Sequence, residues 1–297
     1  MVEVLVGQDA VDSLLGVLDL EPIDAGLFRG PRTEGGLQRV FGGQVAGQAL
    51  VAAGRTVPAD RRVHSLHGYF VRPGDSTKPI IYQVENIRDG RSFSVRRTVA
   101  LQGGQTIFFM SASFHTGEQG LEHSGHAPAD VPGPDSVPPL SEQLKTHPER
   151  LGIWARKPRP IDVRYIGGSG FSASGERPAL EHQRVWMKAD GKLPDDPLIH
   201  VCVLTYASDL TLLDSVLSRH GAVWGPGGYL GTSLDHALWF HHPFRFDEWT
   251  LYDAVSPTAA DGRGLAQGRF YDAAGLHIAS ATQEGLLRQT PEAPGVP

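Results

Sequence analysis

An internal repeat constrains the fold of this chain more than any other sequence feature. Residues Tyr69–Glu85 (YFVRPGDSTKPIIYQVE) align with Trp239–Val255 (WFHHPFRFDEWTLYDAV) at a constant offset of 170 positions. The identical residues at this offset are Phe70 and Phe240, Pro73 and Pro243, and Tyr82 and Tyr252. The chain of 297 residues has room for two domains of ordinary size.

A second pair of segments continues the repeat at an offset of 172 positions, DGRSFSVRR at Asp89–Arg97 and DGRGLAQGR at Asp261–Arg269. The matched residues are Asp89 and Asp261, Gly90 and Gly262, Arg91 and Arg263, Arg97 and Arg269, and Gly103 and Gly275. A loop that is two residues longer in the second copy explains the change of offset. The tripeptide DGR alone is a common turn, but eight ordered matches indicate an internal duplication.

Each copy shows the same order of predicted elements. One apolar helix comes first, Gly43–Ala53 in the first copy and about Leu198–Ala207 in the second, and both have the composition of a buried helix. Four strands follow in each copy, separated by turns that favour antiparallel hairpins. They are His67–Val71, Ile80–Asn86, Ser92–Leu101 and Thr106–His115, then Ala237–His241, Thr250–Ser256, Gly264–Tyr271 and His277–Leu287. The pattern predicts an α+β fold in which a sheet surrounds one helix, twice.

The two copies are separated by a segment without hydrophobic periodicity. Residues Thr116–Pro139 are rich in Pro, Gly and acidic residues, as in a linker or a long surface connection. We therefore predict an N-terminal repeat over residues 1–115, a linker over 116–150 and a C-terminal repeat over 151–297. The second copy also inserts Leu212–Thr232 between its helix and its strands, and we expect the Gly-rich part of this insertion, GPGGYLG, to be a surface loop.

Composition and charge narrow the function classes. The formal net charge is −6 and no run of Lys and Arg forms a basic stripe, which argues against nucleic acid as the main partner. The single cysteine, Cys202, excludes an intramolecular disulfide and a multi-thiolate metal site. We find neither an apolar segment of membrane-spanning length nor a signal-peptide pattern, so we expect no membrane span and a cytoplasmic location.

Histidine and glycine clusters in the sequence carry weak signals. Adjacent residues on a strand point to opposite faces, so His241 and His242 are not expected to share a metal ion. The pair His64 and His67 also lacks a recognisable zinc-ligand spacing, and we predict no metal site. The segment Gly42–Leu50 (GGQVAGQAL) lacks the residues of a phosphate-binding loop. It favours close packing of a buried helix, whose N-terminal N–H groups would also suit a developing oxyanion.

Three polar residues in the second copy are candidates for chemistry. Asp209 lies in YASDLTLLD, directly after an apolar run, where it is either the N-cap of a helix over Leu210–Leu217 or a carboxylate beside a pocket. Ser233 has no nucleophile-elbow motif around it, so we interpret its hydroxyl as a hydrogen-bonding group. Gln283 and Glu284 face opposite ways on a strand, and an inward glutamine is able to orient a water molecule.

Six segments together resemble the acyl-CoA thioesterase II family: RVFGGQVAGQAL, VHSLHGYFVRPGD, PIIYQVENIRDGRSFSVRR, YASDL, SLDHALWFHHPF and SATQEGLLR, in this order. The resemblance covers roughly Leu27–His115 and Glu181–Arg288. It implies a double hotdog fold and hydrolysis of acyl-CoA, expected to be medium- to long-chain fatty acyl-CoA, to free fatty acid and CoA. It also implies no metal or organic cofactor, and a homo-oligomeric assembly.

The resemblance also implies roles for individual residues. Asp209 corresponds to the catalytic carboxylate that activates water, and Ser233 and Gln283 correspond to the residues that orient this water. Many members carry Thr where this chain has Ser233, and Thr232 immediately precedes it, so either hydroxyl is a candidate. We expect substrate contacts from Thr232, Arg91, Gly90 and His64. Arg72 and Arg97 join Arg91 as candidate contacts for the CoA phosphates.

Two other functions compete with hydrolysis. A hotdog hydratase or dehydratase would resemble YxxxGDxNPxH, with a His five residues after the Asp, but Asp214 occupies that position here and Thr211-Leu212 replace Asn-Pro. A non-catalytic acyl-CoA binding protein would keep the pocket and lose turnover. The presence of all three catalytic residue types favours the enzyme.

Overall fold

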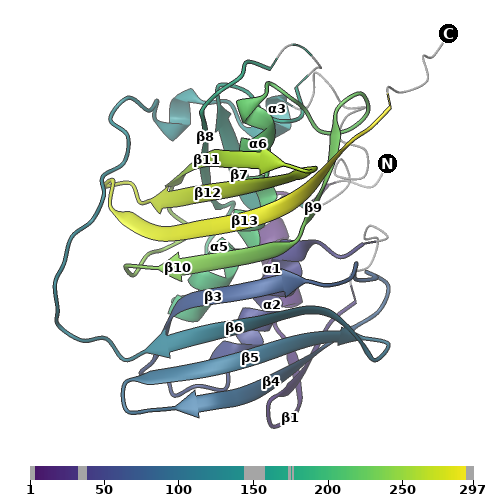
Figure 1. Cartoon of the computed structure of the whole chain (residues 1–297). Coiled ribbons are helices and arrows are strands. Elements are labelled where there is room, and N and C mark those ends of the chain that lie inside the picture. The colour runs from purple at the N-terminus through teal and green to yellow at the C-terminus, as the bar shows by residue number, and fades with distance from the viewer. Residues whose placement is uncertain (1–3, 33–38, 144–157, 173–174, 176, 292–297) are drawn as a thin grey trace.

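A single antiparallel sheet of 13 strands surrounds two central helices (Figure 1). The computed structural model describes residues 4–32, 39–143, 158–172, 175 and 177–291. The elements of the first half are α1 (Gly7–Leu18), β1 (Glu21–Asp24), β2 (Leu27–Gly30), α2 (Gly42–Gly54), β3 (Arg62–Phe70), β4 (Ile80–Asp89), β5 (Phe93–Gln102) and β6 (Gln105–His115).

The second half repeats this plan with two additions, α6 and β9. Its elements are a 3-10 turn (Pro134–Ser136), α3 (Leu140–Gln143), β7 (Ile161–Ile166), β8 (His182–Ala189), α5 (Pro197–Thr211), α6 (Asp214–Arg219), β9 (Tyr229–Ser233), β10 (Asp235–Phe240), β11 (Thr250–Ala260), β12 (Arg263–Tyr271) and β13 (His277–Gln289). The central helix, α2 or α5, precedes the long strands in each half, as the duplication predicts.

The strand order shows how the two copies combine. The order is β1-β2-β4-β5-β6-β3-β10-β13-β12-β11-β8-β7, and β9 pairs with the end of β13. The halves join where β3 pairs with β10, and in this ladder Ala237 lies opposite His67. These two residues are separated by the same 170 positions as the repeated blocks. An approximate two-fold axis therefore passes between them, and each strand of the first half has its counterpart in the second.

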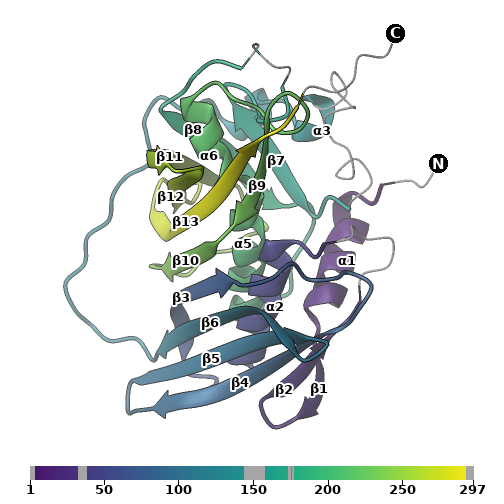
Figure 2. The same cartoon turned by 45° about the vertical axis from the view of Figure 1, so that its right-hand side comes forward.

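The two central helices pack against each other on one side of the sheet (Figure 2). Glycines of α2 allow this close approach. A Cβ on Gly43 would collide with the backbone carbonyl of Tyr206, and one on Gly54 would lie 2.6 Å from a methyl group of Leu198. Nearly every residue of α2 is buried. This confirms the interpretation that its glycines serve helix packing.

The predicted elements agree with the structure except in the insertion. Both central helices and all eight predicted strands are present, although β3 begins at Arg62 rather than His67. The expectation of a surface loop over GPGGYLG was wrong in part, because Tyr229–Gly231 belong to β9. Gly228 lies so close to Val223 that a side chain would collide with its carbonyl group, and this contact helps the segment to turn into the strand.

The connection between the halves runs outside the sheet over residues 116–133 (Figure 1). It contains no helix or strand and touches the second half at few points. His126 forms an isolated bridge with Leu276, and the Trp186 indole donates a 2.8 Å hydrogen bond to the carbonyl of Pro132. Residues 144–150 of the expected linker and 151–157 of the expected C-terminal repeat lie outside the described residues. The boundaries at 115 and 151 stay predictions.

Hydropathy alone would assign the centre of the second half to a membrane-spanning segment. Contrary to the expectation from the sequence, Pro197–Arg219, which form α5 and α6, are long and apolar enough to cross a membrane. However, 72% of their most apolar 18-residue stretch is buried inside the protein. This is the character of a core helix.

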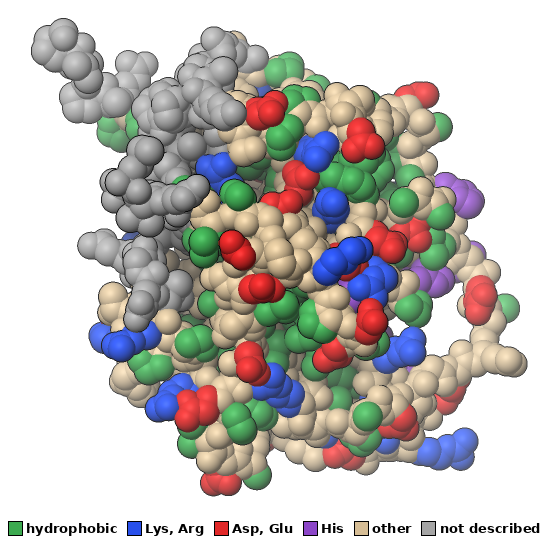
Figure 3. Space-filling view, turned by 180° about the vertical axis from the view of Figure 1, so that it is seen from behind, with side chains coloured by type: hydrophobic (Ala, Val, Ile, Leu, Met, Phe, Trp, Pro, Cys, Tyr) green, Lys and Arg blue, Asp and Glu red, His purple; other side chains and the backbone are tan. Residues whose placement is uncertain are grey.

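On the face seen from behind, acidic and basic side chains are interspersed over the described surface (Figure 3).

Candidate active site

Asp209 lies in the last turn of α5, at the junction of the two halves. This helix begins at Pro197, after Asp196, whose side chain accepts a 2.9 Å hydrogen bond from the N–H of Leu198. Such a start, an Asp N-cap followed by proline, is strongly favoured. The helix continues to Thr211, so Asp209 does not cap a helix that starts at Leu210. The N-cap interpretation was wrong, because the apolar run and the residues that follow it form one helix.

The structure brings Asp209, Ser233 and Gln283 together. Oδ1 of Asp209 accepts a 2.6 Å hydrogen bond from Nε2 of Gln283 and a 3.1 Å hydrogen bond from the hydroxyl of Ser233. Gln283 is fully buried on β13, and its neighbour Glu284 points outward to Arg263. The opposite orientations of Gln283 and Glu284 confirm the sequence prediction. The three polar side chains thus come from one helix and two neighbouring strands.

The direction of the chain on either side of Leu234 determines whether the hydroxyl of Ser233 or that of Thr232 reaches Asp209. β9 pairs with the end of β13, whereas β10 pairs with its beginning, and Leu234 connects the two. Ser233 is half-buried and donates to Asp209, whereas Thr232 is exposed. Because successive side chains of a strand alternate in direction, only one of these two hydroxyls is able to face the carboxylate.

The N-terminus of α2, from the other half, closes the site on its remaining side. A Cβ on Gly42 would lie 2.7 Å from Oδ2 of Asp209 and 3.0 Å from the Phe70 ring, so glycine is required for this approach. The backbone N–H of Gly43 also stabilises the ionised carboxylate. The positive end of the helix dipole has the same effect. The sequence had placed a possible anion site at this helix start without indicating its partner.

Two opposing effects determine the pKa of the Asp209 carboxyl group. Burial raises the pKa of Asp209 from 3.8 to about 6, because an apolar environment disfavours the charged form. The hydrogen bonds from Gln283, Ser233 and the backbone of Gly43 oppose this rise. The carboxylate is therefore ionised at neutral pH, with a pKa close to the range that suits a general base. Within the described residues, Oε1 of Gln283 accepts no hydrogen bond.

Ser208 and His236 support the turn that carries Asp209. The Ser208 hydroxyl donates to the Thr205 carbonyl (2.9 Å) and lies 2.7 Å from Nε2 of His236. Since its one proton is donated to Thr205, the hydroxyl accepts from the Nε2–H of neutral His236. Burial lowers the pKa of His236 to about 4, which keeps the ring neutral. Asp235 does not pair with this histidine; it accepts a 2.6 Å hydrogen bond from the N–H of Glu284.

Three of the expected substrate contacts lie elsewhere. His64 lies six residues before Phe70 on β3. At the rise of a strand this places it about 20 Å from Phe70, whose ring is next to Gly42 and the site. Its Nε2 lies 2.8 Å from the Ser113 hydroxyl. Gly90 and Arg91 belong to the turn between β4 and β5, at the same far end of the strands. The structure therefore does not bring these residues to Asp209.

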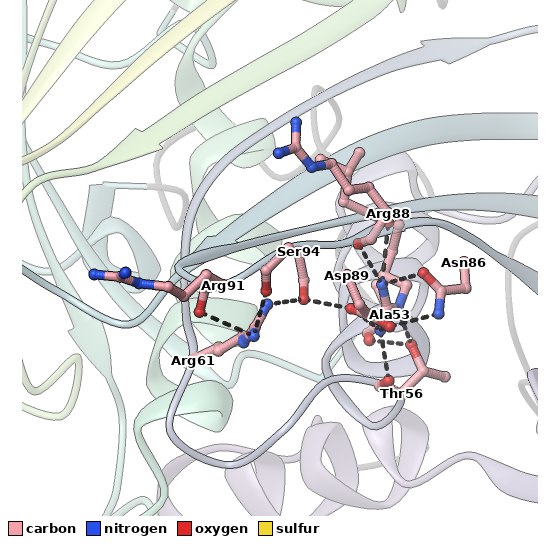
Figure 4. Close-up of polar contacts among 11 residues, drawn as sticks. Ala53, Thr56, Arg61, Asn86, Arg88, Asp89, Arg91 and Ser94 are labelled. Atoms are coloured by element: carbon pink, nitrogen blue, oxygen red, sulfur yellow. Dashed lines mark hydrogen bonds and ion pairs between the residues drawn. The ribbon is translucent and has the colours of Figure 1, made fainter.

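The β4–β5 turn is held by two arginines (Figure 4). Arg61 donates to the carbonyl of Gly90 (2.8 Å), and the buried Arg96 pairs with Asp89 at 2.9 Å and donates to Asn86 at 2.8 Å. Arg91 contributes its backbone carbonyl, and its guanidinium points away from the group. The first DGR, Asp89–Arg91, therefore holds a turn together, whereas in the second copy the side chain of Arg263 pairs with Glu284.

The other candidate contacts for the CoA phosphates, and the single cysteine, lie on the surface or in the core. Arg97 lies over the ring of Phe109, at 5.8 Å, and Arg72 donates to the carbonyl of Thr106 near the end of β3. Cys202 is fully buried, and burial raises the pKa of its thiol. Among the described residues, no three His, Cys, Asp or Glu side chains are placed to hold a metal ion.

Two family models match this chain, in the order of its two halves. The model described as acyl-CoA thioesterase N-terminal domain covers residues 29–115, and the model described as acyl-CoA thioesterase covers residues 172–286. Together they include both central helices and all three residues of the site.

Relatives match over nearly their whole lengths. The chain is 39% identical to acyl-CoA thioesterase 2 of Haemophilus influenzae, over 94% of this chain and 98% of the relative. It is also 39% identical to human acyl-coenzyme A thioesterase 8, over 93% and 89% of the two chains.

Solved structures agree with these matches. An acyl-CoA thioesterase II (TesB2) from Mycobacterium marinum superposes with a TM-score of 0.76 at 41% identity, over 93% of this chain and 98% of that chain. A protein with a hot dog fold from Alicyclobacillus acidocaldarius has a TM-score of 0.74 at 21% identity, over 95% and 99% of the two chains. The predicted α+β double hotdog is thus confirmed, and the chain belongs to the acyl-CoA thioesterase II family.

Proposed function

We propose that this protein hydrolyses medium- to long-chain fatty acyl-CoA to free fatty acid and CoA, with Asp209, Ser233 and Gln283 as its catalytic residues. The proposal rests on one observation. The Ser233 hydroxyl and the Gln283 amide both donate hydrogen bonds to Oδ1 of Asp209. Membership of the acyl-CoA thioesterase II family supports the reaction and the substrate class.

The chemistry follows from the types of group present. Ionised Asp209 takes a proton from a water molecule while the water oxygen attacks the thioester carbonyl carbon. Ser233 and Gln283 fix the carboxylate and position the water. Oε1 of Gln283, which has no partner among the described residues, is able to accept a hydrogen bond from the second O–H of this water. When the C–S bond breaks, the proton held by Asp209 passes to the CoA thiolate. A thiolate leaves readily, so no covalent enzyme intermediate is needed.

The start of α2 suits the negative charge that develops on the carbonyl oxygen. The first N–H groups of a helix have no partners within the helix, and they carry a partial positive charge. Gly42 and Gly43 allow the backbone of this 13-residue helix to approach the reacting groups closely. Backbone N–H donors aimed at a developing oxyanion are among the largest contributions to catalysis.

The environment of Asp214 argues against a hydratase. A hydratase of the hotdog type would need an imidazole at this position, but Asp214 is fully buried in an ion pair with Arg177 at 2.8 Å. Arg177 also donates to Gln183. Asp214 is therefore committed to a structural contact. A second acid–base group is not required for hydrolysis by a single carboxylate.

Two further expectations extend the proposal. Thr232, which is exposed beside Ser233, is our remaining candidate for a substrate contact near the thioester. We also propose a homo-oligomer. In the described part of the chain, β1 and β7 end the sheet with no strand paired beyond them, and Tyr69 and Phe93 expose aromatic surface on its strands. Light scattering during size-exclusion chromatography tests the assembly directly.

The experiment for the reaction is thiol release from acyl-CoA substrates of 4 to 16 carbons. We expect Asp209→Asn to lower kcat by about 100- to 10,000-fold, the usual contribution of a general base. The matched control is Asp130→Asn on the exposed connection, which should retain full activity. Equal rates for wild type and Asp209→Asn would contradict the mechanism. Hydration of crotonyl-CoA without thiol release would contradict the function.

A further inference from the structure

The two halves carry a tyrosine at the same place in the sheet, Tyr82 on β4 and Tyr252 on β11. The two tyrosines match at the repeat offset of 170 positions. The residues paired with them in the neighbouring strands, Ala100 and Phe270, are also 170 positions apart. Both tyrosines belong to the buried core. A difference between their contacts therefore reflects a difference between the two halves.

Among the described residues, only the first of these two hydroxyls has a hydrogen-bond partner. Tyr82 donates a 2.6 Å hydrogen bond to Oε1 of Gln48, which lies on α2. The hydroxyl of Tyr252 is buried and bonds to no described residue. Leaving a buried hydroxyl unpaired costs free energy, so such a group in a folded protein indicates a bound water or ligand.

The ring of Tyr252 leans across β12 toward the active site. A Cβ on Gly268 of β12 would collide with this ring and lie 2.9 Å from its hydroxyl oxygen, so glycine is required there. Gly268 pairs with Ala281 of β13, two residues before Gln283. Because alternate residues of a strand project to the same face, Gln283 projects from the face over which the phenol lies. Stacking on Phe270, with ring centroids 3.7 Å apart, holds the phenol in this position.

Two buried groups of complementary type lie on this face of the sheet. The O–H of Tyr252 is a donor without an acceptor among the described residues, and Oε1 of Gln283 is an acceptor without a donor among them. Asp209 is near both. It accepts from the amide of Gln283, and its negative charge adds to the effect of burial in raising the pKa of Tyr252. A buried water typically makes about three hydrogen bonds, and these three side chains are able to supply them.

We propose that Tyr252 donates its O–H to the water that Asp209 activates and so fixes the direction in which this water attacks. The inference rests on the proposed function, because it takes this water to be the nucleophile. A water molecule has two O–H bonds and two lone pairs. When its O–H bonds point to Asp209 and to Oε1 of Gln283, the hydrogen bond from Tyr252 occupies one lone pair. The other lone pair is left for the thioester carbonyl carbon. The proton removed from the water goes to Asp209, and Tyr252 keeps its own.

Tyr252→Phe tests the inference, because it removes one oxygen atom and retains the ring. We expect kcat for dodecanoyl-CoA to fall about tenfold, the loss of one hydrogen bond to the reacting group. KM should stay within twofold of wild type, since the proposed contact is to the water and not to the substrate. Tm should change by less than 3 °C, because the lost hydroxyl has no partner among the described residues. Wild-type kcat in a folded Tyr252→Phe would overturn the inference.

Tyr82→Phe is the matched control at the equivalent position of the first half. It breaks the hydrogen bond to Gln48 and leaves the buried Oε1 of Gln48 unpaired, so Tm should fall. Its kcat and KM should stay at the wild-type values. An equal fall of kcat in the two variants would mean that both tyrosines act only through the packing of the core, and would also overturn the inference.

A crystal structure of the wild type locates the water without using turnover. We expect an ordered water within hydrogen-bonding distance of the Tyr252 hydroxyl, Oε1 of Gln283 and the Asp209 carboxylate. In Tyr252→Phe this water should be lost or displaced. A Tyr252 hydroxyl without a water in well-ordered wild-type crystals would overturn the inference. If the water is present but no acyl-CoA releases thiol, the proposed hydrolysis is contradicted, whereas the assignment of Tyr252 as a ligand of this water stands.

Discussion

The amide of Gln283 donates a 2.6 Å hydrogen bond to Oδ1 of Asp209, although 74 residues separate them in the sequence. Gln283 is fully buried on β13, so its amide has no access to solvent. Among the hydrogen bonds that oppose the effect of burial on the pKa of Asp209, the one from Gln283 has the largest effect, ahead of those from Ser233 and Gly43. Both the position and the basicity of the carboxylate therefore depend on it.

We predict that Gln283→Leu lowers kcat at least tenfold and moves the acidic limb of the pH–rate profile upward. The substitution keeps the approximate volume but removes the donor, so the charged form of Asp209 loses a stabilising hydrogen bond. The measurement is kcat and kcat/KM for dodecanoyl-CoA between pH 4.5 and 9. Gln267→Leu, at an exposed position on β12, is the matched control. An unshifted acidic limb in Gln283→Leu would show that the hydrogen bond does not tune the carboxylate.

The wild-type enzyme should lose activity as the pH falls through about 6. The pKa of Asp209 is raised from 3.8 to about 6, and a general base acts only in its deprotonated form. We expect kcat/KM to fall about tenfold per pH unit below that value and to be level above it. A rate that remains level down to pH 4.5, with the protein still folded by circular dichroism, would exclude Asp209 as the base.

Asp209→Asn should be more stable than the wild type at neutral pH. The folded state raises the pKa of this carboxyl, so it binds a proton more tightly when folded, and the wild type loses stability as the pH rises from 3.8 through 6. The neutral amide avoids this loss. We expect a gain of about 2 kcal/mol at pH 8, less than the full shift implies because the side chain is partly exposed. The gain should vanish near pH 4, as measured by urea unfolding at both pH values.

The repeated core of the fold was predictable because its signals are local. The helices α2 and α5 are long apolar runs, and the eight long strands alternate between turns, so periodicity finds them. α1 has apolar residues at helical spacing, with Val11, Leu14 and Leu18 buried, but it lies before the repeated blocks and was not assigned. β9 was missed because glycines and a proline precede it, and its pairing with β13 depends on residues far away in the sequence.

The site was only partly predictable for a related reason. An Asp after an apolar run either ends one helix or caps the next, and the pattern is the same in both cases. The meeting of Asp209 with Ser233 and Gln283 was expected from the family resemblance and not from spacing. Nothing in the sequence placed Gly42 beside Asp209, since that contact exists only when α2 and α5 pack together. His64 and Arg91 were drawn from conspicuous motifs that the structure places at the far end of the sheet.

Gly42→Ala should impair catalysis without unfolding the protein. The new methyl group would lie 2.7 Å from Oδ2 of Asp209 and 3.0 Å from the Phe70 ring, so the carboxylate has to move. We expect kcat to fall at least tenfold with a change of less than 3 °C in Tm. Gly16→Ala in α1 is the control, because nothing lies within 4 Å of its added Cβ. It should keep full activity and gain up to about 1 kcal/mol of stability from helix propensity. Wild-type kcat in Gly42→Ala would show that the carboxylate tolerates displacement.

His236 should make the protein sensitive to acid. Burial lowers the pKa of His236 from 6.5 to about 4, so the unfolded chain binds a proton there that the folded protein rejects. Its contribution to stability is therefore complete above pH 6.5 and is lost as the pH falls through 4, a loss of roughly 3 kcal/mol. His236→Gln has no group that titrates in this range and keeps an N–H donor for Ser208. We expect the difference in unfolding free energy between wild type and variant to shrink by about that amount between pH 7.5 and 4. A constant difference, measured by urea unfolding, would mean that His236 is already charged in the folded protein.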